Sequence, residues 1–220
     1  MGPLISIGAN VNETWFAMAA AFYASAEYAA LGRDTTGFVR DLYRTFFNRD
    51  ADDDGLAYWV GLVGSGLPRE IVLTSFMFSP EFVGFTARLF GNTSARAEVD
   101  MVMDFYRGLL GRTPDYNGFN AWIARFRSAQ CAGEAAVVAE VDAISKAFVT
   151  SPEYAARNRS DTLYVADLSN AFLRRGGDRD GVSYWIGRVG VYLREDARRA
   201  FVASPEFQAR VKAVIAQGCS

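Results

Sequence analysis

The chain has 220 residues, of which 50% are hydrophobic and 22% are charged, and its formal net charge is −2. This balance predicts a globular protein with a buried core in one or two domains, and the absence of a strongly basic face argues against a nucleic-acid partner. The chain contains no histidine, which excludes Ser-His-Asp and Cys-His catalysis and every zinc site that needs imidazole. No apolar run reaches the ~20 residues needed to cross a bilayer, so we expect no membrane span.

Residues 1–34 are predicted to form half of a repeating unit. They contain "FYASAEY" at Phe22–Tyr28, a copy of a block that returns three times later in the chain. The opening "MGPLISIGANVNETW" has neither the basic region nor the long apolar region of a Sec signal peptide. An exported protein that begins in this way is expected to carry its signal at the C-terminus or to be an excised domain.

Residues 35–94 are predicted to form the first full unit, and their periodicity is helical. Apolar side chains recur at i, i+3, i+4, i+7 and i+8 from Val39 to Phe47, which gives one apolar helix face. A second stripe runs from Leu56 to Val63, and "REIVLTSFMF" gives a third helix. In the following "SPE", serine is a predicted N-cap, proline takes the first helical position and glutamate favours the first turn, so Ser79 opens a fourth helix.

The unit repeats twice more, as residues 95–159 and as residues 160–220 with the C-terminal tail. Trp59, Trp122 and Trp185 are each 63 residues apart. No convincing alternating strand is present, so we predict an all-α protein of tandem helical repeats, about four helices per repeat, packed into one compact body. The other recurring positions are Asp41/Asp104/Asp167, Arg49/Arg112/Arg175, Asp52/Asp115/Asp178, Gly55/Gly118/Gly181 and Ser79/Ser151/Ser204.

The middle unit carries surplus residues near 127–136. Its Trp-to-serine distance is 29 residues, against 20 and 19 in the other units. We expect this insertion to be a surface excursion. It contains Cys131, and the only other cysteine is Cys219. The two are too few for a Cys-only structural zinc site, and they form either one disulfide, which suits an oxidising compartment, or two buried free thiols.

The loop "NRDADDDGLAYW" of the first unit begins like an EF-hand. Asp50, Asp52 and Asp54 stand at loop positions 1, 3 and 5, and Gly55 follows at position 6. Position 12, however, is Gly61, where an EF-hand needs a bidentate glutamate.

The sister loops give this acidic run a second interpretation. Thr113 and Gly176 replace the first acid, so the recurring pattern is Asp-x-[Asp/Asn]-Gly before a helix. That pattern is typical of helix N-capping and turn chemistry, which we favour. The alternative is a Ca²⁺ site at the first copy only, held by Asp50, Asp52 and Asp54 with backbone carbonyls.

The acid that recurs on each first helix is predicted to form a structural ion pair with the recurring arginine, as between Asp41 and Arg49. Three copies argue against a general acid or base. The recurring tryptophans are predicted to pack in the core rather than to serve as sugar platforms. Their neighbours Tyr58 and Tyr184 are expected to show an edge, which makes them candidate ligand-facing aromatics.

The pattern "Y…R..D..G..YW" followed by "F..SPEF" resembles the DUF4214 domain, a bacterial family of undefined function. The resemblance covers residues 38–207 three times, with the fragment at 22–28. Two departures are Ser169 in place of the aromatic at Tyr43, and Ala121 in place of the tyrosine of "YW". The resemblance implies an all-helical fold and a setting in secreted bacterial proteins, including S-layer proteins, calcium-binding exoproteins and adhesins. Similar regions of some S-layer proteins anchor the layer to lipopolysaccharide, and the family supplies no catalytic residues.

We therefore expect a non-enzymatic interaction or anchoring module of an exported bacterial surface protein, located outside the cell or on its surface. Its expected partner is a lipopolysaccharide-like surface glycan or another surface protein. The alternative is a calcium-stabilised structural domain of a secreted exoprotein, with Ca²⁺ as its cofactor. An enzyme is the third hypothesis and the weakest, because no nucleophile elbow and no phosphate loop accompany the missing histidine.

Overall fold

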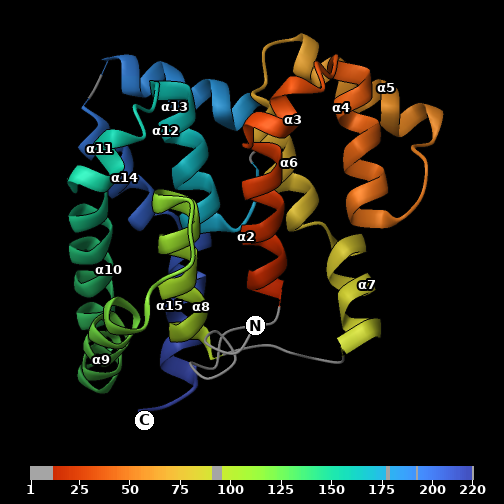
Figure 1. Ribbon diagram of the computed structural model, residues 1–220. Coiled ribbons are helices and arrows are strands. Elements are labelled where there is room, and N and C mark those ends of the chain that lie inside the picture. Colours follow the sequence, from red (N-terminus) through yellow and green to blue (C-terminus); the bar gives the residue numbers. More distant parts are fainter. Residues whose placement is uncertain (1–11, 91–95, 177–178, 192, 220) are drawn as a thin grey trace.

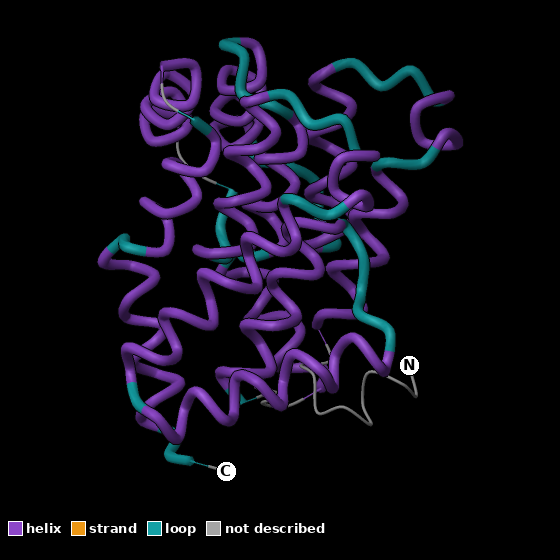
Figure 2. Tube along the Cα trace, turned by 90° about the vertical axis from the view of Figure 1, so that its left-hand side faces the viewer, coloured by secondary structure: helices purple, strands orange, loops and turns teal. Residues whose placement is uncertain are grey.

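The computed structural model describes residues 12–90, 96–176, 179–191 and 193–219. Helices are the only regular elements of these ranges, as the sequence predicts (Figures 1 and 2). None of the helices found there is both long enough and apolar enough to span a bilayer.

Each full unit has four helices, and the first helix continues into a π-helical turn. The half unit has α2 (Asn12–Tyr23) and α3 (Ala26–Ala30). The first unit has α4 (Thr35–Leu42), η1 (Tyr43–Phe47), α5 (Asp53–Gly64), α6 (Arg69–Met77) and α7 (Pro80–Phe90). The middle unit has α8 (Ala97–Phe105), η2 (Tyr106–Leu110), α9 (Tyr116–Ala132), α10 (Glu134–Val149) and α11 (Pro152–Ala156). The third unit has α12 (Asp161–Leu168), η3 (Ser169–Leu173), α13 (Arg179–Val191), α14 (Arg194–Val202) and α15 (Pro205–Ala216).

The serine of each SPE block is an N-cap, as predicted. The hydroxyl of Ser79 accepts a hydrogen bond from the Phe82 N–H at 3.2 Å, and Ser151 accepts one from the Tyr154 N–H at 3.0 Å. Ser25 in the partial copy and Ser204 in the third unit do the same. These caps satisfy backbone donors that would otherwise lack a partner, so each SPE helix begins at a fixed residue.

The three π turns fix where each first helix ends. The residue after each turn is left-handed: Asn48 has a φ of 52°, Gly111 of 69° and Arg174 of 52°. Asparagine and glycine adopt this conformation readily, whereas for an arginine it costs on the order of 1 kcal/mol. Arg174 is held there by a cluster of buried charges.

That charge cluster joins the half unit to the middle and third units. Glu13 of α2 pairs with Arg107 of η2 and with Arg174, the latter at 2.9 Å. Asp104 is fully buried and contacts all three arginines of the cluster. Because acids and arginines balance, loss of one partner leaves a buried charge uncompensated, which costs about 3–5 kcal/mol. The six members are Glu13, Asp100, Asp104, Arg107, Arg174 and Arg210.

The buried apolar side chains form two clusters within one packed body. One cluster belongs mainly to α2–α7 and the other mainly to α8–α15. These two groups of helices occupy the right and left sides of Figure 1. Ala166 and Val182 of the third unit belong to the first cluster, and Ile186 packs against both. The third unit therefore ties the two halves of the molecule together.

The insertion in the middle unit is helical, and its tip is exposed at Cys131, Ala132, Glu134 and Ala135, in accord with the predicted surface position. The surplus residues lengthen α9 to 17 residues and α10 to 16, with only a sharp turn at Gly133 between them. Gln130 and Val137 are buried in the enlarged interface. A helix extended on its apolar face gains more burial than an exposed loop, and this stabilises the longer hairpin.

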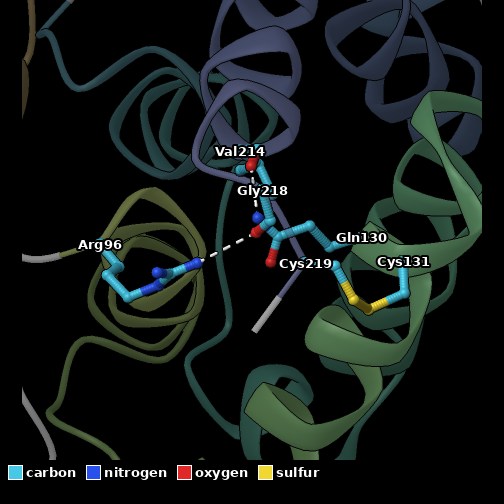
Figure 3. The surroundings of a disulfide bond; sticks show 6 residues. All are labelled: Arg96, Gln130, Cys131, Val214, Gly218 and Cys219. Carbon is cyan, nitrogen blue, oxygen red and sulfur yellow. Dashed lines mark hydrogen bonds between the residues drawn. A yellow bond between two sulfur atoms is a disulfide. The ribbon is translucent and has the colours of Figure 1, made fainter.

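Cys131 and Cys219 form a disulfide that connects the end of α9 to the C-terminal tail (Figure 3). Their Cα atoms lie 4.8 Å apart, within the usual range for a disulfide. Beside it, the Gln130 side-chain amide donates to the Val214 carbonyl, and Arg96 donates to the Gly218 carbonyl at 3.3 Å. Of the two interpretations of the cysteines, the disulfide holds.

Candidate binding site where the four units meet

The acidic loops build helix N-caps, as the sequence analysis favoured. Asp52 Oδ1 accepts a hydrogen bond from the Gly55 N–H at 2.8 Å, and Asp115 accepts the equivalent bond from Gly118 at 2.8 Å. Each of these interactions holds the pKa of the aspartate below its usual value, with the backbone hydrogen bond as the main cause. Asp178 lies outside the described residues.

The three acids of the predicted calcium loop do not converge on one point. Asp50 Oδ1 accepts from Arg44 Nε at 3.0 Å, and Asp52 Oδ2 from Arg49 Nη1 at 3.3 Å, while Asp54 lies in the exposed first turn of α5. Within the described ranges, no group of three or more acidic or cysteine side chains is placed to hold a metal ion. Calcium at this loop remains a prediction, and the loop offers it no ready-made set of ligands.

The recurring arginine pairs with the glutamate of the SPE block, so its predicted pairing with the first-helix acid is wrong. Arg49 makes two hydrogen bonds to Glu81, at 2.9 and 3.1 Å. Arg112 and Glu153 pair in the same way, and Arg175 lies 3.3 Å from Glu206. The pair joins the loop after the π turn to the fourth helix in all three units.

The first-helix acid instead anchors the segment that enters its own helix. Asp41 accepts hydrogen bonds from the Tyr28 hydroxyl at 2.9 Å and from Arg33 Nε at 2.8 Å. The equivalent residues, 126 positions later in the sequence, make the same two hydrogen bonds: Asp167 accepts from the Tyr154 hydroxyl and from Arg159 Nε, both at 2.9 Å. In the middle unit, Asp104 lies in the buried charge cluster. Burial raises the pKa of Tyr28, and its bond to Asp41 raises it further, so this hydroxyl remains a donor at neutral pH.

The tryptophans pack in the core, as predicted. Trp59, Trp122 and Trp185 are half-buried, and each lies against the phenylalanine that opens the SPE block of its unit. Tyr58 and Tyr184 are exposed, as expected, at 59% and 55%. The two tyrosines lie on α5 and α13 and do not line the cavity described next.

A cavity lies where all four units meet. It holds about 570 Å³ and is lined by α2 and the loop after α3, by α4 and α6, by the end of η2, and by α12 and η3. Asn170 of η3 donates to the Thr74 hydroxyl of α6 at 3.4 Å across this seam. The aromatic rings of Tyr23, Tyr28 and Phe38 line one wall.

Arginine is the commonest charged residue in the lining of this cavity, which we call the seam cavity. Its charged lining residues are five arginines and two acids: Arg33, Arg69, Arg107, Arg157, Arg159, Glu70 and Asp167. Arg159 lies between the two acids and binds both. Arg157 donates to the Leu109 carbonyl and lies 3.7 Å from Asp167. Carboxylates outside the lining neutralise two further arginines, since Arg33 pairs with Asp41 and Arg107 pairs with Glu13 and Asp104.

Arg69 is the arginine with the least compensation. It donates to the Arg33 carbonyl at 2.9 Å and stacks on Phe38, 5.0 Å from the ring centre. In the part of the chain that the structure describes, no carboxylate forms an ion pair with it. Its counterpart in the third unit, Arg194, makes the same carbonyl bond and stacks on Tyr164, but it also pairs with Asp161 at 2.7 Å.

Sequence reasoning did not find this site. Its residues come from all four units, and no spacing rule places Arg69 beside Arg157. One signal was present in the sequence: Tyr28, Arg33 and Asp41 recur with the same spacing as Tyr154, Arg159 and Asp167. That signal marks the structural clusters on both sides of the cavity, although not the cavity itself.

The comparisons with known proteins give a family and no closer relative. The family model described as "Domain of unknown function (DUF4214)" matches residues 19–86 and 145–211, which together are more than half of the chain. Each matched region contains one complete tyrosine–arginine–aspartate cluster and ends after an SPE block, and residues 87–144, which include most of the middle unit, lie between the two. No curated protein and no solved structure matched the chain. The chain belongs to the DUF4214 family.

Proposed function

We propose that the protein is a non-enzymatic anchoring module of an exported bacterial surface protein, and that it binds an acidic surface glycan in the seam cavity. The observation that carries this proposal is the guanidinium of Arg69, which pairs with no carboxylate of the described residues and lines a cavity of about 570 Å³. Concave sites with aromatic walls and a few convergent polar groups are typical binding sites for small ligands and sugars.

The lining offers each chemical feature that an acidic sugar needs. Arg69 supplies an uncompensated guanidinium for a carboxylate or phosphate group, which it can bind with two parallel hydrogen bonds. Tyr23 and Tyr28, which are partly exposed, supply ring surface for a sugar face, and Thr74 and Asn170 supply polar atoms for hydroxyl groups. This combination favours an acidic saccharide over a neutral one.

The disulfide supports the exported setting. Disulfides persist in oxidising surroundings and are rare where glutathione keeps thiols reduced. The pair Cys131–Cys219 is therefore in accord with a protein that works outside the cytoplasm. The bacterial surface itself is an expectation that comes from the family resemblance.

The test is calorimetric titration with an inner-core lipopolysaccharide oligosaccharide, which carries carboxylate and phosphate groups, beside a neutral dextran oligosaccharide. We expect binding of the acidic probe, no binding of dextran, and a loss of about tenfold or more in affinity for Arg69→Gln, because one charge-assisted hydrogen-bonded pair is removed. The matched control is Arg194→Gln, which removes the charge-paired counterpart and is expected to leave the affinity unchanged. Equal affinity for both probes, or an unchanged affinity in Arg69→Gln, contradicts the proposal.

The calcium-stabilised alternative has its own test. It depends on the exposed carboxylates of Asp50, Asp52 and Asp54 in and before the first turn of α5. If calcium stabilises the domain there, millimolar Ca²⁺ raises the melting temperature, and Asp50→Asn removes the effect. An unchanged melting temperature excludes this alternative.

A further inference from the structure

Among the residues that the structure describes, none covers the face of α2 that carries Met18 and Phe22, although the equivalent faces in the other three units are covered. The block "FYASAEY" aligns with "FMFSPEF", "FVTSPEY" and "FVASPEF", so α2 corresponds to α6, α10 and α14. Phe22 then corresponds to Phe76, Phe148 and Phe201.

The three equivalents of Phe22 are buried against a tryptophan of their own unit. They are 2%, 6% and 1% exposed, and their ring centres lie 5.2, 5.6 and 4.9 Å from those of Trp59, Trp122 and Trp185 respectively. Phe22 is 63% exposed. The described residues of the half unit include no helix that corresponds to α5, α9 or α13, and Trp15 of α2 lies against Phe90 instead. The ring that is a core residue in the other units is therefore on the surface here.

One turn earlier on the same face, Met18 repeats this contrast. It is 39% exposed, whereas its equivalents Val72, Ile144 and Ala197 are at most 4% exposed. A repeat at the end of an array normally carries a polar outer face, because an apolar one is left in water. Met18 and Phe22 are large apolar side chains at i and i+4 on α2, and they give this face the composition of a repeat inside an array.

We propose that this face of α2 is a docking surface for the tryptophan-bearing helix of another unit of the same repeat, whose tryptophan packs on Phe22 as Trp59 packs on Phe76. The interface continues one that this chain already forms three times, between α5 and α6, α9 and α10, and α13 and α14. The partner is thus an amphipathic helix with tryptophan in the phase of Trp59.

A second copy of this chain does not meet that requirement. Each of its recurring tryptophans is already packed on the phenylalanine of its own unit. Docking on α2 would remove a tryptophan from an interface of the same kind, with no net gain in burial.

The proposal can be tested with a chimera that places a tryptophan helix before α2 at the spacing found in the other units. Residues 35–65 are placed directly before Asn12 in place of residues 1–11, so that the added tryptophan lies 17 residues before Phe22, the spacing of Trp59 and Phe76. We expect the chimera to melt at least about 3 °C above the parent chain, because burial of Phe22 and a tryptophan adds stability. Phe22→Ala is expected to lower the melting temperature of the chimera by several degrees and that of the parent by less than about 1 °C.

The matched control is the same chimera with alanine in place of the added tryptophan, which is expected to lose most of the gain. A chimera that melts no higher than the parent, or a Phe22→Ala effect of the same size in both chains, overturns the proposal.

Two measurements on the parent chain keep the proposal testable if the chimera does not fold. Phe22→Ser is expected to leave the melting temperature nearly unchanged, whereas Phe201→Ser lowers it strongly or prevents folding. Sedimentation equilibrium is expected to show no association that depends on Phe22. Equal destabilisation by the two serine variants would show that Phe22 is buried within the chain itself. A dimer that Phe22→Ser abolishes would show that a second copy covers this face. Either result overturns the proposal.

Discussion

Gly55 and Gly118 recur because a tyrosine hydroxyl occupies the space that a side chain would need. A Cβ atom at Gly55 would lie 2.1 Å from the Tyr43 hydroxyl oxygen, and one at Gly118 would lie 2.4 Å from that of Tyr106. Both tyrosines are nearly fully buried, so neither ring can swing away without loss of packing. In the first and middle units, the glycine and the aromatic residue of the π turn are therefore one structural pair; in the third unit Ser169 stands in place of the tyrosine.

Gly55→Ala is expected to destabilise the protein by about 1–3 kcal/mol, because the added methyl group overpacks a site that is already full. Gly61→Ala is the matched control: it lies on the same helix, its Cβ would have no neighbour within 4 Å, and it is expected to be neutral or to stabilise by about 0.5–1 kcal/mol. Urea unfolding of both variants measures the difference. Equal effects would contradict the account of the pair.

The pKa of Asp100 is raised to about 6, chiefly by burial, although Arg174 lowers it. The folded state therefore binds more protons than the unfolded state between about pH 4 and pH 6. The contribution of this carboxyl to the free energy of unfolding is fully present below about pH 4 and is lost as the pH rises through 6.

Asp100→Asn removes this titration. The wild type is expected to lose up to about 3 kcal/mol of stability relative to the variant between pH 4 and pH 7. Urea titrations at several pH values measure the difference. A wild type that loses no stability relative to the variant over this range would show that Asp100 is not held protonated by burial.

At the scale of elements, the packing of η2 on η3 depends on one missing side chain. A Cβ at Gly108 would lie 2.5 Å from the backbone nitrogen of Ala171 and 2.6 Å from its Cβ. Two backbone segments cannot separate as easily as a side chain can rotate. Gly108 therefore sets the distance between the middle and third units, close to the seam cavity that it also lines.

Gly108→Ala is expected to cost about 3 kcal/mol and to lower binding of the acidic probe, since the two segments must move apart. Gly64→Ala, also helical but with no neighbour within 4 Å of an added Cβ, is the control and is expected to change neither. Thermal unfolding and calorimetric titration check both effects. A fully stable Gly108→Ala variant would show that this contact is not a constraint.

The helices and their N-caps could be predicted from the sequence, because 3.6-residue periodicity and the SPE and Asp-x-[Asp/Asn]-Gly patterns report local physics. The π turns could not, because a change from i→i+4 to i→i+5 hydrogen bonding leaves no residue signature at Tyr43 or Ser169. The helical form of the insertion could not be predicted for a related reason: it depends on tertiary contacts such as that of buried Gln130 with the Val214 carbonyl of α15.

At the scale of the whole molecule, the disulfide holds the C-terminal tail to the inserted part of the middle unit. It closes a loop of 88 residues in sequence. The double variant Cys131→Ser/Cys219→Ser is expected to lose about 2–5 kcal/mol, because the unfolded chain regains its freedom. Unfolding with and without reductant measures this loss. Equal stability in both conditions would show that the tail is held by its other contacts.

The seam cavity could not be predicted from the sequence for a reason that also belongs to this scale. Asp41 and Arg49 recur together, which suggested an ion pair, but the tertiary structure joins Arg49 to Glu81 and Asp41 to Arg33. Arg69 differs from its counterpart Arg194 only because Thr35 replaces Asp161 at a distant position. The charge of a site between units is decided by such substitutions, which are visible only when the units are assembled.

The most direct test of the central claim, that the seam cavity binds an acidic glycan, is an NMR titration that follows the arginine side-chain Nε–Hε signals. The lipopolysaccharide inner-core oligosaccharide is expected to shift the signals of Arg69 and Arg157 in a saturable manner, while that of Arg194 stays in place and dextran shifts none. Saturable shifts confined to residues outside the seam cavity, or none for Arg69 at saturating probe, would contradict the claim.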